Sequence, residues 1–275
     1  MTVAGSANAE SRMGNMRWAA HDAWVLTLRG LSHWRRQPLQ IIAGMGFMIM
    51  LVVLFAFLFG GAMNVPGQGD YLGFLMPGMF VMTMAFGVGE TMASVTADAD
   101  RGVTDRFRSM PMASSAVVLG RSITDMLYAT VGLTVMVATG LVLGWRWHGT
   151  PLEALGAIGL LLLLRFGVLW VGIFLGLVIP GAAAVNAVWT LLFPLTMVTN
   201  TFAPTESMPV WLGTIAEWNP LSATVYATRD LFGNPGADGT SFVAQNAMAF
   251  AIAWPLVLVA IFLPLAVRKY RRLSR

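Results

Sequence analysis

The charged side chains near the middle of the sequence are the residues best placed to do chemistry. Residues 97–112 read ADADRGVTDRFRSMPM, and six of the eleven residues from position 98 to position 108 are charged. The six are Asp98, Asp100, Arg101, Asp105, Arg106 and Arg108. Because both signs occur, the stretch offers hydrogen-bond donors and acceptors together, which suits ionic docking against a soluble partner.

Groups that could make or break bonds are scarce. The sequence has no cysteine, which excludes disulfides and thiolate metal sites. Its three histidines lack metal-ligand spacing, and neither H-E-x-x-H nor G-x-S-x-G occurs. A phosphate-binding G-x-x-x-x-G-K-[ST] loop is impossible, because Tyr270 follows the single lysine, Lys269. We therefore expect a non-catalytic chain with no metal or cofactor of its own.

Long apolar segments must position the charged cluster. Hydrophobic residues make up 57% of the 275 residues and charged residues 11%, and the mean hydropathy is +0.70. Apolar runs of about 20 residues, the length of a membrane-crossing helix, recur along the chain. Lipid leaves backbone groups without partners and the alternation of a β-barrel is missing, so we expect an all-α integral membrane protein with six transmembrane helices. The spans are expected near 39–61, 72–92, 116–144, 154–178, 184–203 and 242–267.

The basic residues predict the orientation of these spans. With the N-terminus in the cytoplasm, fourteen of the 17 Lys and Arg residues fall on the inner side, and only Arg146 and Arg229 fall outside. Because cytoplasmic loops are enriched in Lys and Arg, we expect a multi-pass protein of the cell membrane with both termini in the cytoplasm. The formal net charge of +4 then suits anionic lipid headgroups rather than nucleic acid. We expect a flexible tail over 1–16, one membrane domain over 17–270 and a basic tail over 271–275.

Two amphipathic segments are expected on the cytoplasmic side. Within residues 97–112, apolar and charged side chains fall on opposite helical faces, and Pro111 ends the pattern. The alternative is a solvated loop whose arginines only fix the topology. Residues 17–36 place tryptophans on one face and arginines on the other, which is typical of a helix in the membrane interface. That helix either anchors the chain or also contacts a partner.

Residues 204–235 contain too many prolines to span the membrane. They predict two short half-helices, roughly 208–218 and 221–232. Trp211 and Trp218 favour the outer membrane interface. Half-helices can enter the outer leaflet only where protein covers their open backbone groups.

Few ionisable residues lie inside the predicted spans. Arg165 lies near the middle of the fourth span, where an arginine costs about 3 kcal/mol on insertion scales, so it should face protein or water. Glu90 and Asp125 are its candidate partners, although Arg121 precedes Asp125 by four residues and could already pair with it. Arg165 therefore forms either a structural ion pair or, with Glu90, part of a transport path.

The fifth predicted span carries a stripe of polar and large side chains. In lipid, polar groups on one face must meet another helix or a cavity. The stripe therefore either packs against a neighbouring helix or lines a transport path. Its members are Asn186, Thr190, Phe193, Met197 and Asn200.

Two parts of the sequence resemble a known family. The run Asp100-Arg101-Gly102, followed by Asp105 through Pro111, resembles the loop between the second and third spans of type-2 ABC exporter permeases, in particular those of daunorubicin/doxorubicin-type drug exporters. Residues 200–204, residues 208–212 and Asn219-Pro220 with Arg229 beyond them fit the same pattern. The resemblance covers roughly residues 17–270.

The resemblance implies a division of labour between chains. A separate cytoplasmic ATPase subunit would bind ATP and Mg, and would dock on the loop and on the N-terminal helix. Two permeases, identical copies or sister chains, would form a route lined by their second and fifth spans. The implied cargo is an amphipathic small molecule such as a drug or antibiotic. The implied coupling residues are Asp100, Arg101, Gly102, Asp105, Arg106, Phe107, Arg108 and Pro111. The implied outer gate, for which a simple sealing cap is the alternative, comprises Pro209, Trp211, Trp218, Asn219 and Pro220.

Other functions remain open at this point. Relatives in the same family move polysaccharides or lipids. An ion-coupled secondary transporter would place carboxylates or unwound helices near the middle of the membrane, whereas Glu90 and Asp125 lie near the inner ends of their predicted spans. A membrane scaffold that only recruits the ATPase is a third possibility.

Overall fold

The computed structural model describes residues 38–61, 70–100, 114–179 and 181–273. Helices form the architecture, and no strand occurs within these ranges, which confirms the predicted all-α class. The long helices are α2 (Pro38–Phe59), α3 (Tyr71–Asp100), α5 (Ser114–Leu143), α6 (Pro151–Val178), α7 (Ala182–Met197) and α11 (Ala247–Leu273).

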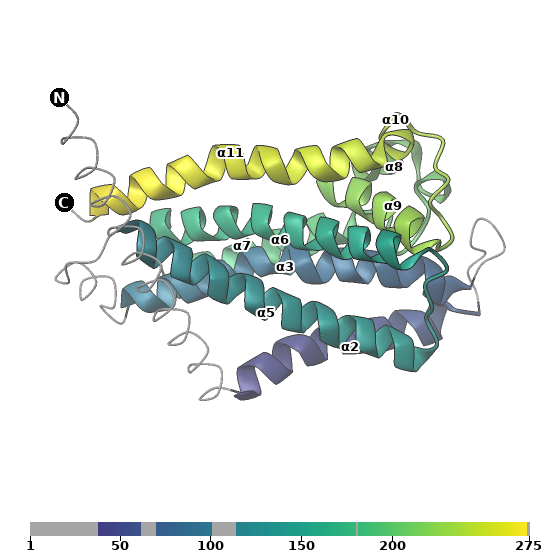
Figure 1. The fold of residues 1–275 in the computed structure, drawn as a ribbon, viewed down its shortest axis with the longest axis horizontal. Helices are drawn as coiled ribbons and strands as arrows, with labels where there is room; N and C mark the ends of the chain where they lie inside the picture. The colour runs from purple at the N-terminus through teal and green to yellow at the C-terminus, as the bar shows by residue number, and fades with distance from the viewer. Residues whose placement is uncertain (1–37, 62–69, 101–113, 180, 274–275) are drawn as a thin grey trace, which may run out of the picture.

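Four short elements gather at one end of the bundle, to the right in Figure 1. They are η1 (Thr205–Ser207), α8 (Val210–Trp218), α9 (Pro220–Phe232) and α10 (Phe242–Gln245), and with their connections we call them the cap. Helices α8 and α9 lie where two short helices were predicted, over 208–218 and 221–232. We call the opposite end, where α3 ends and α5 begins, the base.

Helix α3 forms the centre of the molecule. Its most apolar stretch is 89% buried, against 17% for α11, and it packs against α6, α9, α7, α5 and α2. Glycines allow α6 to approach closely, since a Cβ added at Gly172 would lie 2.7 Å from the Val88 carbonyl oxygen, and one added at Gly176 would lie 2.7 Å from Val95. The second predicted span is therefore covered mainly by the chain's own helices.

Helices long and apolar enough to cross a membrane occur at four places in the described ranges. They are Tyr71–Ala99, Gly120–Leu143, Pro151–Val178 and Ala247–Tyr270, and they correspond to the second, third, fourth and sixth predicted spans. The apolar parts of α2 and α7 are shorter, at Gly44–Phe59 and Ala182–Met197. The count of six crossings stays a prediction.

The fifth predicted span ends earlier than its sequence pattern indicated. Helix α7 stops at Met197 rather than near residue 203. Pro194 lies within its last turn, and the Asn219 side chain donates hydrogen bonds to the carbonyls of Leu195 (2.8 Å) and Val198 (2.9 Å). Tertiary hydrogen bonds thus satisfy the helix end and let the chain turn away.

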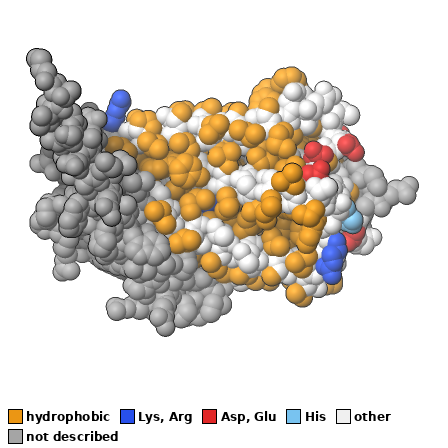
Figure 2. Space-filling model, viewed as in Figure 1, with side chains coloured by type: hydrophobic (Ala, Val, Ile, Leu, Met, Phe, Trp, Pro, Cys, Tyr) orange, Lys and Arg blue, Asp and Glu red, His pale blue; other side chains and the backbone are white. Residues whose placement is uncertain are grey.

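The surface matches a protein embedded in lipid. Figure 2 shows hydrophobic side chains over most of the visible face between the two ends, with acidic, basic and histidine side chains at the cap end. Exposed large hydrophobic residues occur along α2, α5, α7 and α11. Apolar exposure of this extent is expected where lipid or another membrane chain covers the surface.

Candidate functional site

A buried ion pair joins α5 to α6. Arg165 has a side chain that is 1% exposed, and it donates two hydrogen bonds to Asp125, from Nε (2.9 Å) and Nη2 (2.8 Å). The Thr91 hydroxyl of α3 donates a third hydrogen bond to Asp125 at 2.8 Å. A two-point arginine–carboxylate contact fixes both side chains and neutralises the buried charge. The predicted interhelical pairing of Arg165 is therefore present.

Glu90 lies beside this pair but makes a looser contact. Its Oε2 is 3.8 Å from Nη2 of Arg165, and its side chain is 36% exposed. Gly87, one turn earlier on α3, lets the guanidinium approach, since a Cβ there would lie 0.9 Å from Nη1. The cluster of Glu90, Asp125 and Arg165 contains two acids and one base, so it has a surplus carboxylate.

Arg121 pairs with a different acid from the one its spacing indicated. It contacts Asp98 at 2.8 Å and donates a hydrogen bond to Ser94 at 2.7 Å, and so ties the base end of α3 to the base end of α5. The i, i+4 pairing with Asp125 does not form, because Arg165 occupies that carboxylate from α6.

The Asp98–Arg121 contact flanks the predicted coupling segment. Residues 101–113 join the two helices that it ties together. Within that segment, Arg101, Gly102, Asp105, Arg106, Phe107, Arg108 and Pro111 lie outside the described residues, as does the side chain of Asp100. The predicted helix over 17–36 and the tail over 1–16 also lie outside them.

The structure divides the predicted stripe of the fifth span. Asn186, Thr190 and Phe193 are exposed on α7, and Met197 is half-buried at its end. Asn200 lies beyond the helix and is fully buried in the cap, where its backbone N–H donates to Ser222 Oγ at 3.2 Å. The exposed part of the stripe faces away from the chain's own core. Asn200 belongs to the cap.

The predicted gate residues lie in the cap at the junction of α8 and α9. Pro209 precedes α8, and Trp211 and Trp218 are exposed on it. Asn219 is buried, and its Oδ1 accepts a hydrogen bond from the Leu221 N–H as the N-cap of α9, where Pro220 occupies the first helical position. A helix start with proline and a capping asparagine is favourable.

Arg229 of α9 is a central residue of the cap, although in the sequence it stood out only as part of the family pattern after Asn219-Pro220. Its side chain is fully buried. Nε donates to the Phe74 carbonyl (3.0 Å), and Nη2 donates to those of Asn200 (2.8 Å) and Thr201 (3.3 Å). The guanidinium carbon lies 3.6 Å from the centre of the Phe74 ring, a cation–π contact.

The charge of Arg229 depends on its surroundings. Burial lowers its pKa to about 9, an effect that Tyr226 and Tyr71 oppose. A pKa of about 9 keeps the side chain charged at neutral pH. The sequence did not predict this role, because the acceptors are backbone carbonyls.

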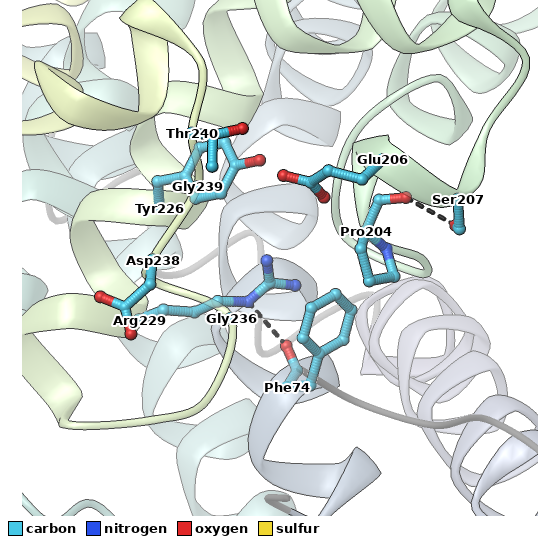
Figure 3. A pocket seen from close by; sticks show the side chains of 10 residues that line it. All are labelled: Phe74, Pro204, Glu206, Ser207, Tyr226, Arg229, Gly236, Asp238, Gly239 and Thr240. Atoms are coloured by element: carbon cyan, nitrogen blue, oxygen red, sulfur yellow. Dashed lines mark hydrogen bonds between the residues drawn. The ribbon is translucent and has the colours of Figure 1, made fainter. Parts of the chain in front are cut away.

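A cavity of about 500 Å³ opens next to Arg229. Its wall comes from α3, α9, η1 and the connection before α10, as Figure 3 shows. The lining residues are Phe74, Pro204, Glu206, Ser207, Tyr226, Arg229, Gly236, Asp238, Gly239 and Thr240. We call it the cap cavity. Across the described part of the chain, no group of His, Asp and Glu residues could hold a metal ion.

Comparisons with known proteins point to one family. The model of the ABC-2 type transporter family matches residues 21–232. The chain is 32% identical over 244 residues to the daunorubicin resistance ABC transporter permease protein DrrB1 of Streptomyces coeruleorubidus, which covers 88% of this chain and 83% of that protein. It is 25% identical over 247 residues to ycf38 of Cyanophora paradoxa, named as a transport permease, with 88% and 84% covered. It is 23% identical over 196 residues to YbhR of Escherichia coli (strain K12), named as a multidrug ABC transporter permease, and these residues cover 69% of this chain and 50% of that protein.

Proposed function

The chain belongs to the ABC-2 type transporter family, and on that premise we propose that it is the permease subunit of an ATP-driven exporter. A separate ATPase subunit would supply the energy, since the sequence allows no phosphate-binding loop of its own. Transport would proceed by alternating access, with two permeases enclosing the route. The expected setting is the cell membrane, with the base in the cytoplasm.

The position of α3 is the observation that carries this proposal. Its base end leads directly into the predicted coupling segment at residues 101–113, and the Asp98–Arg121 pair ties that end to α5. Its other end reaches the cap, where Arg229 holds the Phe74 carbonyl. A buried, closely packed helix transmits displacement rather than absorbing it. ATPase closure at the base would therefore reach the cap through α3.

The proposed cargo is an amphipathic small molecule of the drug or antibiotic type. Its support is the name of the Streptomyces relative, a daunorubicin resistance ABC transporter permease. The exposed Asn186, Thr190 and Phe193 of α7 would face the route shared with the second permease. Polar groups exposed in a membrane helix favour a water-filled path or another helix over lipid.

Purification of the tagged chain from native membranes in mild detergent, followed by mass spectrometry, tests the proposal. We expect a stoichiometric subunit with a Walker A sequence, and we expect Asp105→Arg with Arg106→Asp to release it while the protein stays in the membrane. Arg275→Glu in the basic tail is the control and should retain the subunit. A chain that purifies alone and transports without ATP would favour ion-coupled transport instead, with Glu90 and Arg165 as the first residues to examine.

A further inference from the structure

The cap cavity contains an unused hydrogen-bond donor. Arg229 is fully buried, and three carbonyls accept hydrogen bonds from its Nε and Nη2. Its Nη1 has no hydrogen-bond partner within the described part of the chain. A buried charged donor without an acceptor costs free energy that any suitably placed oxygen would recover. Nη1 of Arg229 therefore lacks an acceptor that a ligand in the cavity would supply.

An acidic side chain lies opposite this donor. Figure 3 shows the Glu206 carboxylate directed into the space between Tyr226 and the Arg229 guanidinium. The two groups are not within ion-pair distance, and no described Lys or Arg pairs with Glu206. Asp238 adds a second exposed carboxylate to the lining, pointing away from the guanidinium. The cavity thus holds separated charges of both signs that do not neutralise each other.

This arrangement selects between classes of ligand. An anion alone would satisfy Nη1 of Arg229 but would be repelled by Glu206 and Asp238. A cation alone would meet the carboxylates and leave Nη1 without an acceptor. A ligand with an oxyanion and an ammonium group a few bonds apart satisfies both sides at once, because opposite charges are then paired in a partly desolvated site.

We propose that the cap cavity binds a short zwitterion, whose oxyanion accepts a hydrogen bond from Arg229 and whose ammonium group donates to Glu206. Phosphoethanolamine has this chemistry, and it occurs both as a lipid headgroup and as a free solute. Phe74 and Pro204 supply an apolar wall for the connecting carbon atoms. The site does not depend on the proposed transport function, since binding here requires neither the ATPase nor a second permease.

Titration calorimetry on the full chain in phosphatidylglycerol nanodiscs tests this site. We expect saturable binding of O-phosphoethanolamine, and at least tenfold weaker binding of inorganic phosphate alone or ethanolamine alone. Glu206→Gln should weaken O-phosphoethanolamine binding at least tenfold. Asp70→Asn is the matched control, because Asp70 is an exposed acid at the same end of α3 that does not line the cavity. No saturable binding, or equal binding by the Glu206 and Asp70 variants, would overturn the proposal.

Two further measurements separate the role of Arg229 from that of Glu206, and a lipid headgroup from a free solute as the source of the ligand. Arg229→Lys keeps the charge but loses the planar donor pattern, so we expect weaker O-phosphoethanolamine binding with ethanolamine binding unchanged. Should that variant fail to fold, the Glu206 variant still decides. Nanodiscs that also contain phosphatidylethanolamine distinguish the sources. Weaker binding of O-phosphoethanolamine in these nanodiscs would show that the lipid headgroup competes for the site and is itself a ligand. Unchanged affinity for O-phosphoethanolamine would identify a soluble ligand.

Discussion

The two buried arginines are stabilised by different acceptors. Arg165 meets the Asp125 carboxylate through two hydrogen bonds, so its charge is neutralised between helices. Arg229 instead relies on backbone carbonyls and on the Phe74 ring. Removing one member of a buried ion pair leaves an uncompensated charge, which is more costly than the pair was favourable. Arg165 should therefore depend strongly on a single side chain, whereas the support of Arg229 is spread over several groups.

Asp125→Asn provides the direct test of the Arg165 pair. The substitution leaves a buried guanidinium without a counter-charge at hydrogen-bond distance, and we expect it to destabilise the protein by about 3 kcal/mol or more. The measurement is the apparent melting temperature of the purified chain in detergent. Glu90→Gln is the matched control, because Glu90 is partly exposed and 3.8 Å from Arg165. A loss as large for Glu90→Gln as for Asp125→Asn would show that the two acids share the pairing.

Gly87→Ala tests the same site by filling the space that the Arg165 guanidinium occupies, without changing any charge. A Cβ at this position would lie 0.9 Å from Nη1 of Arg165, so the guanidinium must leave its place beside Asp125. We expect a lower apparent melting temperature, although alanine favours a helix more than glycine does. Gly46→Ala on α2 should be neutral or slightly stabilising, since nothing lies within 4 Å of a Cβ there. Equal effects of the two substitutions would contradict the position given to Arg165.

The two arginines also differ in how far sequence alone could predict them. Arg165 lies in an apolar run, and a charge there needs an acid on another span, which left only Glu90 and Asp125 as partners. The structure confirms that all three lie together. Arg229 was noted only as part of the family pattern. Its burial was not predicted, because its acceptors are backbone carbonyls, which are present at every residue. Asp238 and Glu206 likewise join it only through the fold of the cap.

At the scale of elements, prolines revealed the cap but not the end of α7. Pro209 directly precedes α8 and Pro220 is the first residue of α9, close to the starts that the sequence indicated. The apolar pattern of α7 continues past Met197, and its true end depends on Asn219, 22 residues further along the chain. The central position of α3 was also not evident, because all the predicted spans are similarly apolar. Contacts distant in sequence decided both features.

Asn219→Ala is expected to loosen the junction of α7, α8 and α9. The side chain caps α9 and donates to the carbonyls of Leu195 and Val198, so its loss should cost about 2 kcal/mol. Thermal unfolding in detergent measures this cost. Asn246→Ala is the control, because that exposed side chain makes a single hydrogen bond, to the Phe242 carbonyl. A junction that depends on packing alone would show no difference between the two.

Asp98→Asn tests the tie between the base ends of α3 and α5. The exposed pair with Arg121 contributes little to stability, about 1 kcal/mol or less, so folding should be nearly unchanged. Under the proposed function, a looser base should transmit less motion, and we expect cargo-stimulated ATP hydrolysis of the reconstituted complex to fall severalfold. Asp70→Asn at the opposite end of α3 should leave that stimulation intact. Unaltered cargo-stimulated ATP hydrolysis in the Asp98 variant would show that coupling does not depend on the Asp98–Arg121 contact.

At the scale of the whole molecule, orientation follows from the distribution of charge. Most basic residues belong to the termini and to the segment between α3 and α5. That segment joins the base ends of α3 and α5, and Arg268 and Lys269 lie in the last turns of α11 at the same end. The cap carries Glu206, Glu217, Asp230 and Asp238 and, in α9, Arg229. Basic residues are retained on the cytoplasmic side, so the cap should face outward. Helices α2 and α7, whose apolar parts are shorter, decide whether the number of crossings is six.

Cysteine labelling tests orientation and the number of crossings together. Because the chain contains no cysteine, an introduced one is its only thiol. We expect Ser207→Cys, which is exposed in the cap, to react with a membrane-impermeant maleimide in intact cells. Ser6→Cys and Ser274→Cys should react only after the cells are permeabilised, since an even number of crossings places both termini on one side. Labelling of these two from opposite sides would mean that the number of crossings is odd and that α2 or α7 turns back within the membrane.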